Sequence, residues 1–216
     1  MWQRLPDTGG LKSMNKIEDA FKNKKAFIPF VTAGDPSLDV TRELILAMQE
    51  AGADLIEIGI PFSDPVAEGP VIQEADDRAL SAGVTTDKIF DMVDDIADKI
   101  HVPIVFMTYI NPIYVYGVEK FAKRAKACGA AGVIVPDVPF EEKEEIRGSF
   151  EAEGLVVISM VAPTSADRVR MIAKEAKGFL YCVSSLGVTG VRTEIGTAIG
   201  DLIQTEIGRA SCRERV

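Results

Sequence analysis

Residues 54–73 read DLIEIGIPFSDPVAEGPVIQ, and the prediction of the fold starts from this stretch. Its first part, Asp54–Ile60, is a short and nearly continuous apolar run, which is typical of a strand covered on both faces. A single acidic residue, Glu57, interrupts that run. The second part carries three prolines and a glycine, so we expect a stiff loop that holds Asp64 and Glu68 in fixed directions.

Similar apolar runs recur along the chain and alternate with segments of helical periodicity. Each run is rich in Val, Ile or Phe and is bounded by Gly, Pro or Asp, as buried strands are. The predicted strands lie at residues 26–31, 54–60, 103–109, 132–135, 155–160 and 179–183. Alternating strands and helices predict a single α/β domain with a parallel sheet.

The intervening helices are predicted from apolar residues spaced three or four apart, which gather on one face. The core face of the helix after the first strand is expected to carry Val40, Leu44, Met48 and Ala51. The core face of a later helix is expected to carry Val169, Ile172, Ala173 and Ala176. Asp167 in the first turn of that later helix and Gly178 just past its end mark its limits.

Among α/β folds, a (β/α)8 barrel fits the chain better than a doubly wound sheet. A doubly wound fold is expected to carry a glycine-rich phosphate motif after its first strand, but residues 32–37 read TAGDPS. A full barrel runs to about 250 residues, and only six strands are found here. We therefore expect an incomplete TIM barrel with about six of its eight β/α units.

The two ends of the chain differ in pattern from the rest. Residues 1–13 lack apolar periodicity, and we interpret them as a non-native or a disordered extension. Residues 206–216 read EIGRASCRERV, which resembles a translated sequencing adapter, so we interpret this tail as an artefact. The partial barrel domain is then expected to span residues 14–205.

Composition excludes several classes of function. The chain has 24 Lys+Arg against 33 Asp+Glu and a net charge of −9, whereas non-specific nucleic-acid binding needs a cationic face. No apolar run approaches the roughly 20 residues of a membrane span, and no signal peptide opens the chain, so we expect a cytoplasmic protein. One histidine and three widely spaced cysteines predict reduced thiols, no disulfide framework and no metal site.

Glu57 is the strongest candidate for chemistry, because acidic side chains are rare within buried strands. Side chains alternate along a strand, so Leu55, Glu57 and Gly59 are expected to face the barrel interior, and the isoleucines between them the helices. A carboxylate near the end of a barrel strand stands where barrel enzymes keep catalytic groups, and desolvation there favours its protonated form. The alternative is a glutamate held in a buried ion pair. Glu68 offers a second carboxylate, and two carboxylates in unlike environments can divide acid and base roles.

Five motifs of the chain resemble the alpha subunit of tryptophan synthase, and together they cover most of residues 14–205. They are FIPFVTAGDPS (27–37), the stretch at 54–73, TYINPI (108–113), VPDVPFEE (135–142) and LGVTG (186–190). The stretch at 54–73 is the most specific of the five. The resemblance implies a (β/α)8 barrel that cleaves indole-3-glycerol phosphate to indole and glyceraldehyde 3-phosphate in tryptophan biosynthesis.

The resemblance also implies three catalytic residues. Glu57 matches the family's strand-end glutamate, which handles the proton at indole C3. Glu68 matches the loop carboxylate that balances charge developing at the indole nitrogen, where many members have the shorter aspartate. Tyr181 matches a tyrosine that lines the substrate pocket.

Further residues match the family's substrate-binding positions. Phe30 matches a ring that packs against the indole. Thr189 and Gly190 match a mobile loop, with Gly190 also on the phosphate side. The phosphate-binding segments that follow the seventh and eighth strands in this family have no counterpart in the sequence, so we expect these 216 residues alone not to turn over substrate.

A partner is implied as well, namely a tryptophan synthase beta subunit in an α2β2 complex. In this family the pyridoxal phosphate belongs to the beta subunit, and the alpha subunit needs no metal or organic cofactor. The surface that meets the beta subunit is matched by Pro61, Asp64, Pro65, Tyr109 and Asn111, and Asp137 lies in a loop at the same end.

Two other functions compete with this interpretation. Another phosphate-binding barrel enzyme of the pathway, such as an indole-glycerol-phosphate synthase or a phosphoribosyl-anthranilate isomerase, is expected to carry a catalytic lysine or cysteine on an early strand. In this chain the buried catalytic candidate on the early strands is Glu57. A non-catalytic activator of a beta subunit would keep the partner surface but would not need Glu57.

Overall fold

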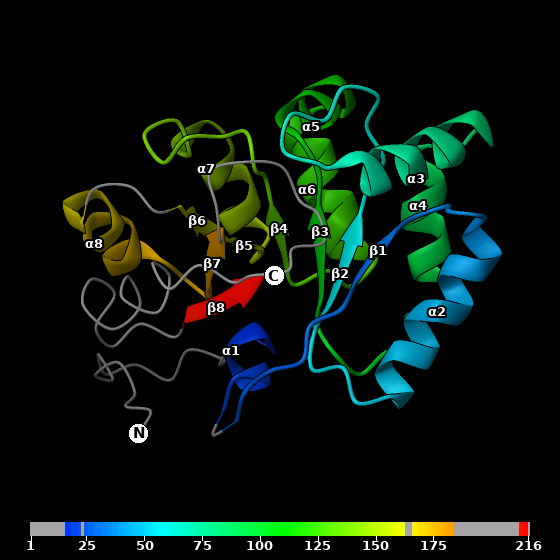
Figure 1. The fold of residues 1–216 in the computed structure, drawn as a ribbon, viewed down its shortest axis with the longest axis horizontal. Helices are drawn as coiled ribbons and strands as arrows, with labels where there is room; N and C mark the ends of the chain where they lie inside the picture. The colour runs from blue at the N-terminus through cyan, green and yellow to red at the C-terminus, as the bar shows by residue number, and fades with distance from the viewer. Residues whose placement is uncertain (1–15, 23, 163–165, 184–211, 216) are drawn as a thin grey trace.

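The computed structural model describes residues 16–22, 24–162, 166–183 and 212–215 (Figure 1). Its helices are α1 (Lys16–Ala20), α2 (Leu38–Glu50), α3 (Pro70–Ser81), α4 (Thr86–Asp94), α5 (Ile110–Tyr116), α6 (Val118–Ala127), α7 (Glu144–Ala152) and α8 (Ala166–Glu175). Its strands are β1 (Phe30–Thr32), β2 (Ile56–Gly59), β3 (Ile104–Met107), β4 (Gly132–Ile134), β5 (Val156–Val157), β6 (Ser159–Val161), β7 (Leu180–Val183) and β8 (Cys212–Arg215). All six predicted strands are present, and the strand–helix alternation confirms the α/β class.

The strands pair in parallel throughout the described residues. One sheet has the order β1-β2-β3-β4-β5, and a second has the order β6-β7-β8. The predicted strand 155–160 is divided between the two sheets: β5 pairs with β4, and β6 pairs with β7. Only Ile158 separates β5 from β6, and its backbone N–H still donates to Val133 of β4 at 2.9 Å. The series of parallel strands therefore continues from the first sheet into the second.

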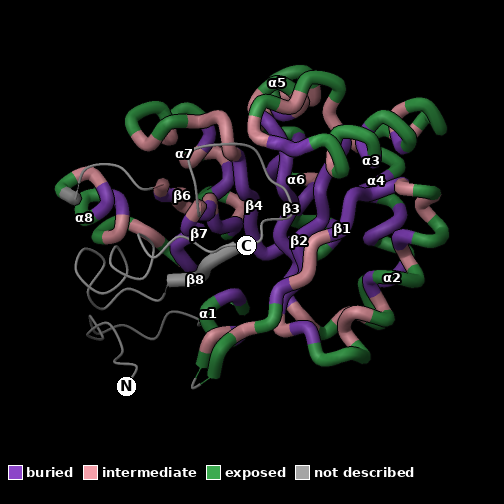
Figure 2. Tube along the Cα trace, in the orientation of Figure 1, coloured by how far each residue is buried: buried purple, intermediate pink, exposed green. Residues whose placement is uncertain are grey.

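The strands are mostly buried, as Figure 2 shows. Side chains on their two faces form separate cores. The outer core lies under the helices and includes Ile56 and Ile58 together with Phe90 of α4. The inner core includes Leu55, which directly precedes β2, and Tyr181 of β7. The predicted alternation is confirmed for the apolar residues of this segment, because Leu55 belongs to the inner core whereas Ile56, Ile58 and Ile60 belong to the outer core.

Helix α1 closes one end of the inner core. Ile17 and its neighbour Ala20 are buried in that core, and the ring of Phe21 lies 5.4 Å from the ring of Phe179. A Cβ atom built on Gly132 or Gly178, at or before the start of a strand, would lie about 3 Å from Ile17. Helix α1 therefore packs against the amino ends of the strands, which leaves the opposite end for the loops that follow them.

The predicted core face is confirmed for α8 and wrong in part for α2. In α8, Val169 and Ile172 are buried as expected. In α2, Val40 and Leu44 are 36% and 38% exposed, and the buried residues are instead Thr41 and Ile45. Threonine is polar and is not expected on a core face. The hydroxyl of Thr41, however, donates to the Ser37 carbonyl and accepts from the Gly34 N–H, both at 2.9 Å. With its hydroxyl bonded on both sides, threonine can occupy the core face.

The structure gives the state of two cysteines. Cys128 is a free and buried thiol. Cys182 is disulfide-bonded, so the expectation of reduced thiols is wrong at that position.

Across the described ranges, no helix has both the length and the apolar character needed to span a bilayer.

Candidate functional site

Glu57 is the acidic side chain at the centre of the candidate site. It is the second residue of β2, a strand whose four residues are all buried, and it is itself 3% exposed, so it lies within the strand and not at the carboxyl end that the sequence predicted. Parallel pairing places Phe30 of β1 and Val105 of β3 on either side of it. Because Leu55 and Val105 belong to the inner core, alternation directs Glu57 to the same interior.

Aromatic rings from two strands contribute to this interior. Phe30 of β1 and Tyr181 of β7 both pack against the inner core. The Phe30 ring lies over Gly59: a Cβ atom built on that glycine would lie 2.6 Å from the ring carbon Cζ. The glycine at the end of β2 therefore leaves the space that the ring occupies.

Glu68 is the second buried carboxylate, and it directly precedes α3. It is 6% exposed, and the residues after it, Gly69 and Pro70, form the N-cap and the first position of the helix. The side-chain amide of Gln73 donates to the Glu68 backbone carbonyl at 2.8 Å. A carboxylate at this place also benefits from the positive end of the helix dipole.

Tyr109, at the N-cap of α5, fastens the loop that carries Glu68. Its hydroxyl accepts a hydrogen bond from the backbone N–H of Ala67 at 3.0 Å, and its ring lies 5.4 Å from the ring of Phe62. Burial, together with the nearby carboxylates of Glu68 and Asp137, raises the pKa of the Tyr109 hydroxyl above its ordinary value. The hydroxyl therefore stays neutral and can keep this contact over the whole physiological pH range.

A third buried carboxylate, Asp76 on α3, is missing from the sequence-based candidates. It is 6% exposed, and burial, followed by the charge of Glu68, raises its pKa to about 7. The signal that would have revealed it is helical spacing. Asp76 falls four residues after Ile72 and three before Ala79, on the face of α3 that packs inward.

The residues predicted to meet a partner belong to segments that follow β2, β3 and β4, at the carboxyl ends of these neighbouring parallel strands, but they differ in exposure. Asp64 and Asn111 are exposed, and Pro65 and Asp137 are half-buried. Pro61 and Tyr109 are buried beneath them. The Asp137 carboxylate accepts from the backbone N–H of Ile110 at 3.0 and 3.2 Å, and burial raises its pKa.

Exposed apolar side chains accompany these residues. Val66 and Val71, in the loop after β2 and at the start of α3, are 74% and 69% exposed. On α5, Tyr114 is 47% exposed and Val115 is 83% exposed. Large apolar side chains exposed on adjacent loops and helices are a common feature of protein-binding surfaces.

Two of the predicted substrate-binding residues, Thr189 and Gly190, lie outside the described residues. Within the described ranges, no group of three His, Cys, Asp or Glu side chains is arranged to hold a metal ion.

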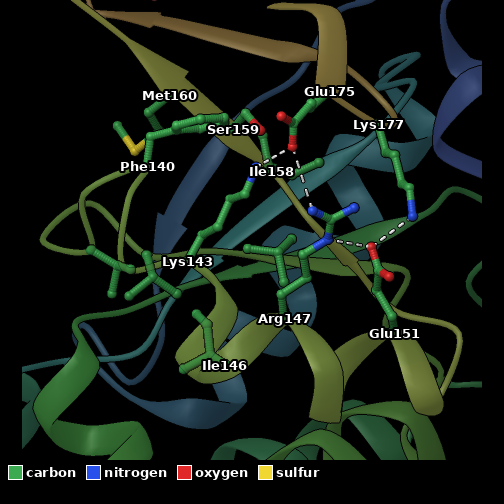
Figure 3. A pocket seen from close by; sticks show the side chains of 13 residues that line it. Phe140, Lys143, Ile146, Arg147, Glu151, Ile158, Ser159, Met160, Glu175 and Lys177 are labelled. Atoms are coloured by element: carbon green, nitrogen blue, oxygen red, sulfur yellow. Dashed lines mark hydrogen bonds and ion pairs between the residues drawn. The ribbon is translucent and has the colours of Figure 1, made fainter. Parts of the chain in front are cut away.

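A separate cavity of about 60 Å³ lies between α7 and β6 (Figure 3). Its rim carries three cations and two carboxylates that pair with one another. Glu175 contacts Lys143 at 2.5 Å and Arg147 at 3.7 Å, and Glu151 contacts Arg147 at 2.8 Å and Lys177 at 2.6 Å. Since each of these charges has a partner and the lining includes none of the buried carboxylates, we place the candidate site at Glu57 and not here.

Comparison with known proteins gives one family. The family model "Tryptophan synthase alpha chain" matches residues 17–209. The tryptophan synthase alpha chain of Halalkalibacterium halodurans is 48% identical over 200 residues, which cover 92% of this chain and 76% of that protein. The one from Petrotoga mobilis is 50% identical over 178 residues, covering 82% of this chain and 69% of the relative.

Solved structures agree with these sequences. A Mycobacterium tuberculosis tryptophan synthase structure matches with a TM-score of 0.83 at 31% identity, over 92% of this chain and 78% of the other. A structure described as the tryptophan synthase a2b2 complex of Pyrococcus furiosus matches with a TM-score of 0.78 at 40% identity, over 88% and 76% of the two chains.

Proposed function

Because the chain belongs to the tryptophan synthase alpha chain family, we propose that Glu57 and Glu68 are the residues with which it cleaves indole-3-glycerol phosphate. The family is one of TIM-barrel lyases, and the products are indole and glyceraldehyde 3-phosphate. The observation that carries the proposal is the burial of both carboxylates, Glu57 within β2 and Glu68 in the loop at the carboxyl end of that strand, with exposures of 3% and 6%. Barrel enzymes assemble their active sites at this end.

Glu57 is the proton-transfer group of the proposed reaction. Breaking the bond between indole C3 and the glycerol chain requires a proton at C3, and the aldehyde product forms as a glycerol hydroxyl loses its proton. One carboxyl group that gives up a proton and then takes one back can serve both steps. Its position in the inner core, beside Phe30, supports this role, because there water does not compete for the proton.

Glu68 is the electrostatic partner in this proposal. Protonation of C3 places positive charge on the indole ring nitrogen, and a buried carboxylate stabilises that charge more strongly than one in water. Two hydrogen bonds hold its loop in place before substrate arrives: the Gln73 side chain donates to the Glu68 carbonyl, and the Ala67 N–H donates to the Tyr109 hydroxyl. Such preorganisation is what makes an electrostatic contribution effective.

The remaining site residues are proposed to bind the substrate. Phe30 packs against the indole ring, and Tyr181 lines the pocket opposite it. Both contact the inner core, which supports these roles. Thr189 and Gly190 are proposed to close over the substrate and to contact its phosphate. This subunit is proposed to need no cofactor.

A tryptophan synthase beta subunit is the proposed partner, and pyridoxal phosphate is proposed to belong to that subunit alone. The proposed contact surface consists of Pro61, Asp64, Pro65, Tyr109, Asn111 and Asp137. The exposed valines and the exposed tyrosine on the adjoining loop and helix support a protein-binding surface here. We propose a cytoplasmic location, as for a biosynthetic enzyme with a soluble partner.

The decisive experiment is the substitution Glu57→Gln in the full-length gene product, assayed in complex with a beta subunit. Glutamine keeps the size of the side chain but cannot exchange a proton, so indole release is expected to fall about 10²–10⁴-fold. Glu50, an exposed residue at the end of α2, provides a matched control, and Glu50→Gln is expected to leave the rate unchanged.

The same variant separates the enzyme from a non-catalytic activator. For an enzyme, Glu57→Gln abolishes cleavage while activation of the beta subunit persists, because Glu57 is buried away from the partner surface. Unchanged indole production in a folded Glu57→Gln protein would overturn the assignment of Glu57.

A further inference from the structure

The hydroxyl of Tyr109 is turned toward the loop at residues 60–69, which carries Glu68. The side chain is only 4% exposed, although the resemblance places this residue on the partner surface. Its hydroxyl accepts from the backbone N–H of Ala67, the residue directly before Glu68, at 3.0 Å. Its ring lies 5.4 Å from the ring of Phe62, near the start of the same loop. One side chain therefore contacts this loop at both its beginning and its end.

The segment that carries Tyr109 is itself held from the next strand of the sheet. The carboxylate of Asp137, in the loop after β4, accepts from the backbone N–H of Ile110 at 3.0 and 3.2 Å. Ile110 directly follows Tyr109 and is the first residue of α5. Because an N–H group at the start of a helix lacks an acceptor within that helix, this contact fixes the place of the first turn and of Tyr109. Hydrogen bonds thus join the loops after β2, β3 and β4 in the order of their strands.

Helix α3 holds the other side of Glu68. The side-chain amide of Gln73 donates to the Glu68 backbone carbonyl at 2.8 Å. Gln73 belongs to the helix into which the loop leads, whereas Tyr109 belongs to the segment after the neighbouring strand. The Tyr109 contact therefore relates the position of Glu68 to the rest of the barrel and not only to its own helix.

We propose that Tyr109 is a positioning residue for Glu68: its hydroxyl holds the Ala67 N–H, and Asp137 in turn holds Tyr109 through Ile110. The proposal rests on the proposed function of Glu68 and deepens it, because it gives Tyr109 a role beyond contact with the partner. Electrostatic stabilisation of a transition state depends on where a charge lies before the reaction. A displaced Glu68 is therefore expected to lower kcat more than it raises KM.

The first test needs no substrate and follows hydrogen exchange at single amides of the full-length gene product by NMR. Tyr109→Phe keeps the ring but removes the acceptor, so the Ala67 amide is expected to exchange about threefold to tenfold faster. The amide of Ile56, which donates to the Pro103 carbonyl at 3.0 Å, reports general loosening of the sheet. Its exchange is expected to change less than about twofold. Equal acceleration at both amides would leave Tyr109 a merely structural role and refute the proposal.

Tyr116, at the other end of α5, provides the matched control. Its ring packs against the outer core, and its hydroxyl donates to Asp87 of α4. Tyr116→Phe removes the same atom from the same helix and is expected to leave exchange at Ala67 as in the wild type. An acceleration at Ala67 as large as in Tyr109→Phe would contradict the proposal.

The second test measures indole release by the full-length gene product with a saturating beta subunit. Tyr109→Phe is expected to lower kcat about threefold to tenfold, with KM changed less than about twofold. Tyr116→Phe is expected to leave both constants unchanged. Calorimetric titration is expected to show nearly the same affinity of Tyr109→Phe for the beta subunit, because the lost hydroxyl faces Ala67. An unchanged kcat, or a fall in kcat explained in full by weaker binding of the beta subunit, would overturn the proposal.

A double-mutant cycle tests the step from Asp137 to Tyr109. Asp137→Ala removes the acceptor for the Ile110 N–H and is expected to lower kcat about twofold to fivefold when Tyr109 is present. In the Tyr109→Phe background the same substitution is expected to have little further effect, because the two residues act in series. Fully additive losses would show that Asp137 acts independently, and this step of the proposal would fail.

Failure of this proposal can be distinguished from failure of the proposed function. If Glu68→Gln left kcat unchanged, Glu68 would have no catalytic role and the proposed function would fail at that residue. Exchange at the Ala67 amide would still decide whether Tyr109 holds the backbone beside Glu68.

Discussion

At the scale of single residues, the part of the chain that the structure describes contains three buried carboxylates: Glu57, Glu68 and Asp76. None of them is a residue that packing alone would select, because burying an acidic side chain is costly. Asp76 is the most informative of the three, because burial and, after it, the charge of Glu68 raise its pKa to about 7. The stability of the fold is therefore expected to depend on pH through this carboxyl group.

The free energy of unfolding is predicted to fall as pH rises from about 4 to about 7. The pKa of Asp76 is near 3.8 in the unfolded chain and about 7 in the folded one, so the folded state binds the extra proton between these values. The stability that this proton provides is complete below pH 4 and is lost as pH rises through 7. The loss amounts to ~3 kcal/mol, and Asp76→Asn is expected to abolish it.

Urea unfolding at pH 5 and pH 8 checks this prediction. Other ionisable groups act alike in both proteins, so the comparison of the wild type with Asp76→Asn isolates Asp76. The exposed Asp77→Asn variant is expected to behave as the wild type does. A decline with pH that is equally large in Asp76→Asn would contradict the assignment.

At the scale of elements, two glycines show how differently strands and helices use this residue. Gly132 begins β4, where a Cβ atom would lie 2.5 Å from the Val156 carbonyl oxygen of the neighbouring strand. Gly148 lies within α7, where a Cβ atom would meet nothing within 4 Å. The first glycine permits the close approach of two strands, while the second only adds freedom to the unfolded chain.

Alanine substitutions at these two positions are predicted to have opposite effects. Gly148→Ala is expected to raise the free energy of unfolding by about 0.5–1 kcal/mol, because alanine favours the helix and meets open space. Gly132→Ala is expected to lower it by about 1–3 kcal/mol, because the backbone of β5 must move. Thermal and urea unfolding of the two variants measure both effects. If both substitutions changed the free energy of unfolding in the same direction, this account of β4 would be contradicted.

At the scale of the whole molecule, the barrel has unlike ends. Helix α1 closes the amino ends of the strands with Ile17, while the carboxyl ends carry the buried acids and a margin of exposed apolar side chains. Val115 of α5 is the most exposed of these, at 83%. A side chain of this kind is costly in water and gains when a partner covers it.

Val115→Ser is therefore predicted to weaken binding of the beta subunit about threefold to tenfold, without altering the fold. The control is Met171→Ser on α8, a residue that is 41% exposed and lies away from the proposed contact surface. Calorimetric titration of each variant with the beta subunit measures the difference. Equal losses of affinity in both variants would place the contact surface elsewhere.

Much of this architecture could be predicted from the sequence, for identifiable reasons. Short apolar runs bounded by glycines and prolines are typical of buried parallel strands, so the six strands could be predicted. Alternation along the second strand then gave the inward direction of Glu57. The motif at residues 54–73 was specific enough to indicate the family, which the comparisons then confirmed. These features are local, and local pattern is what a sequence records directly.

Other features depended on which segments meet in space. Sequence spacing suggested that Val40 and Leu44 face the core, but the Thr41 hydroxyl donates to the Ser37 carbonyl and accepts from the Gly34 N–H, which lets Thr41 take that place. The pKa of Asp76 arises from burial and from carboxylates on other segments, and no periodicity within α3 reveals those neighbours. The sequence thus determined the strands, the family and the inward glutamate, because each follows from nearby residues. Only the folded arrangement determined the raised pKa of Asp76, because solvation and electrostatic fields depend on distances in space.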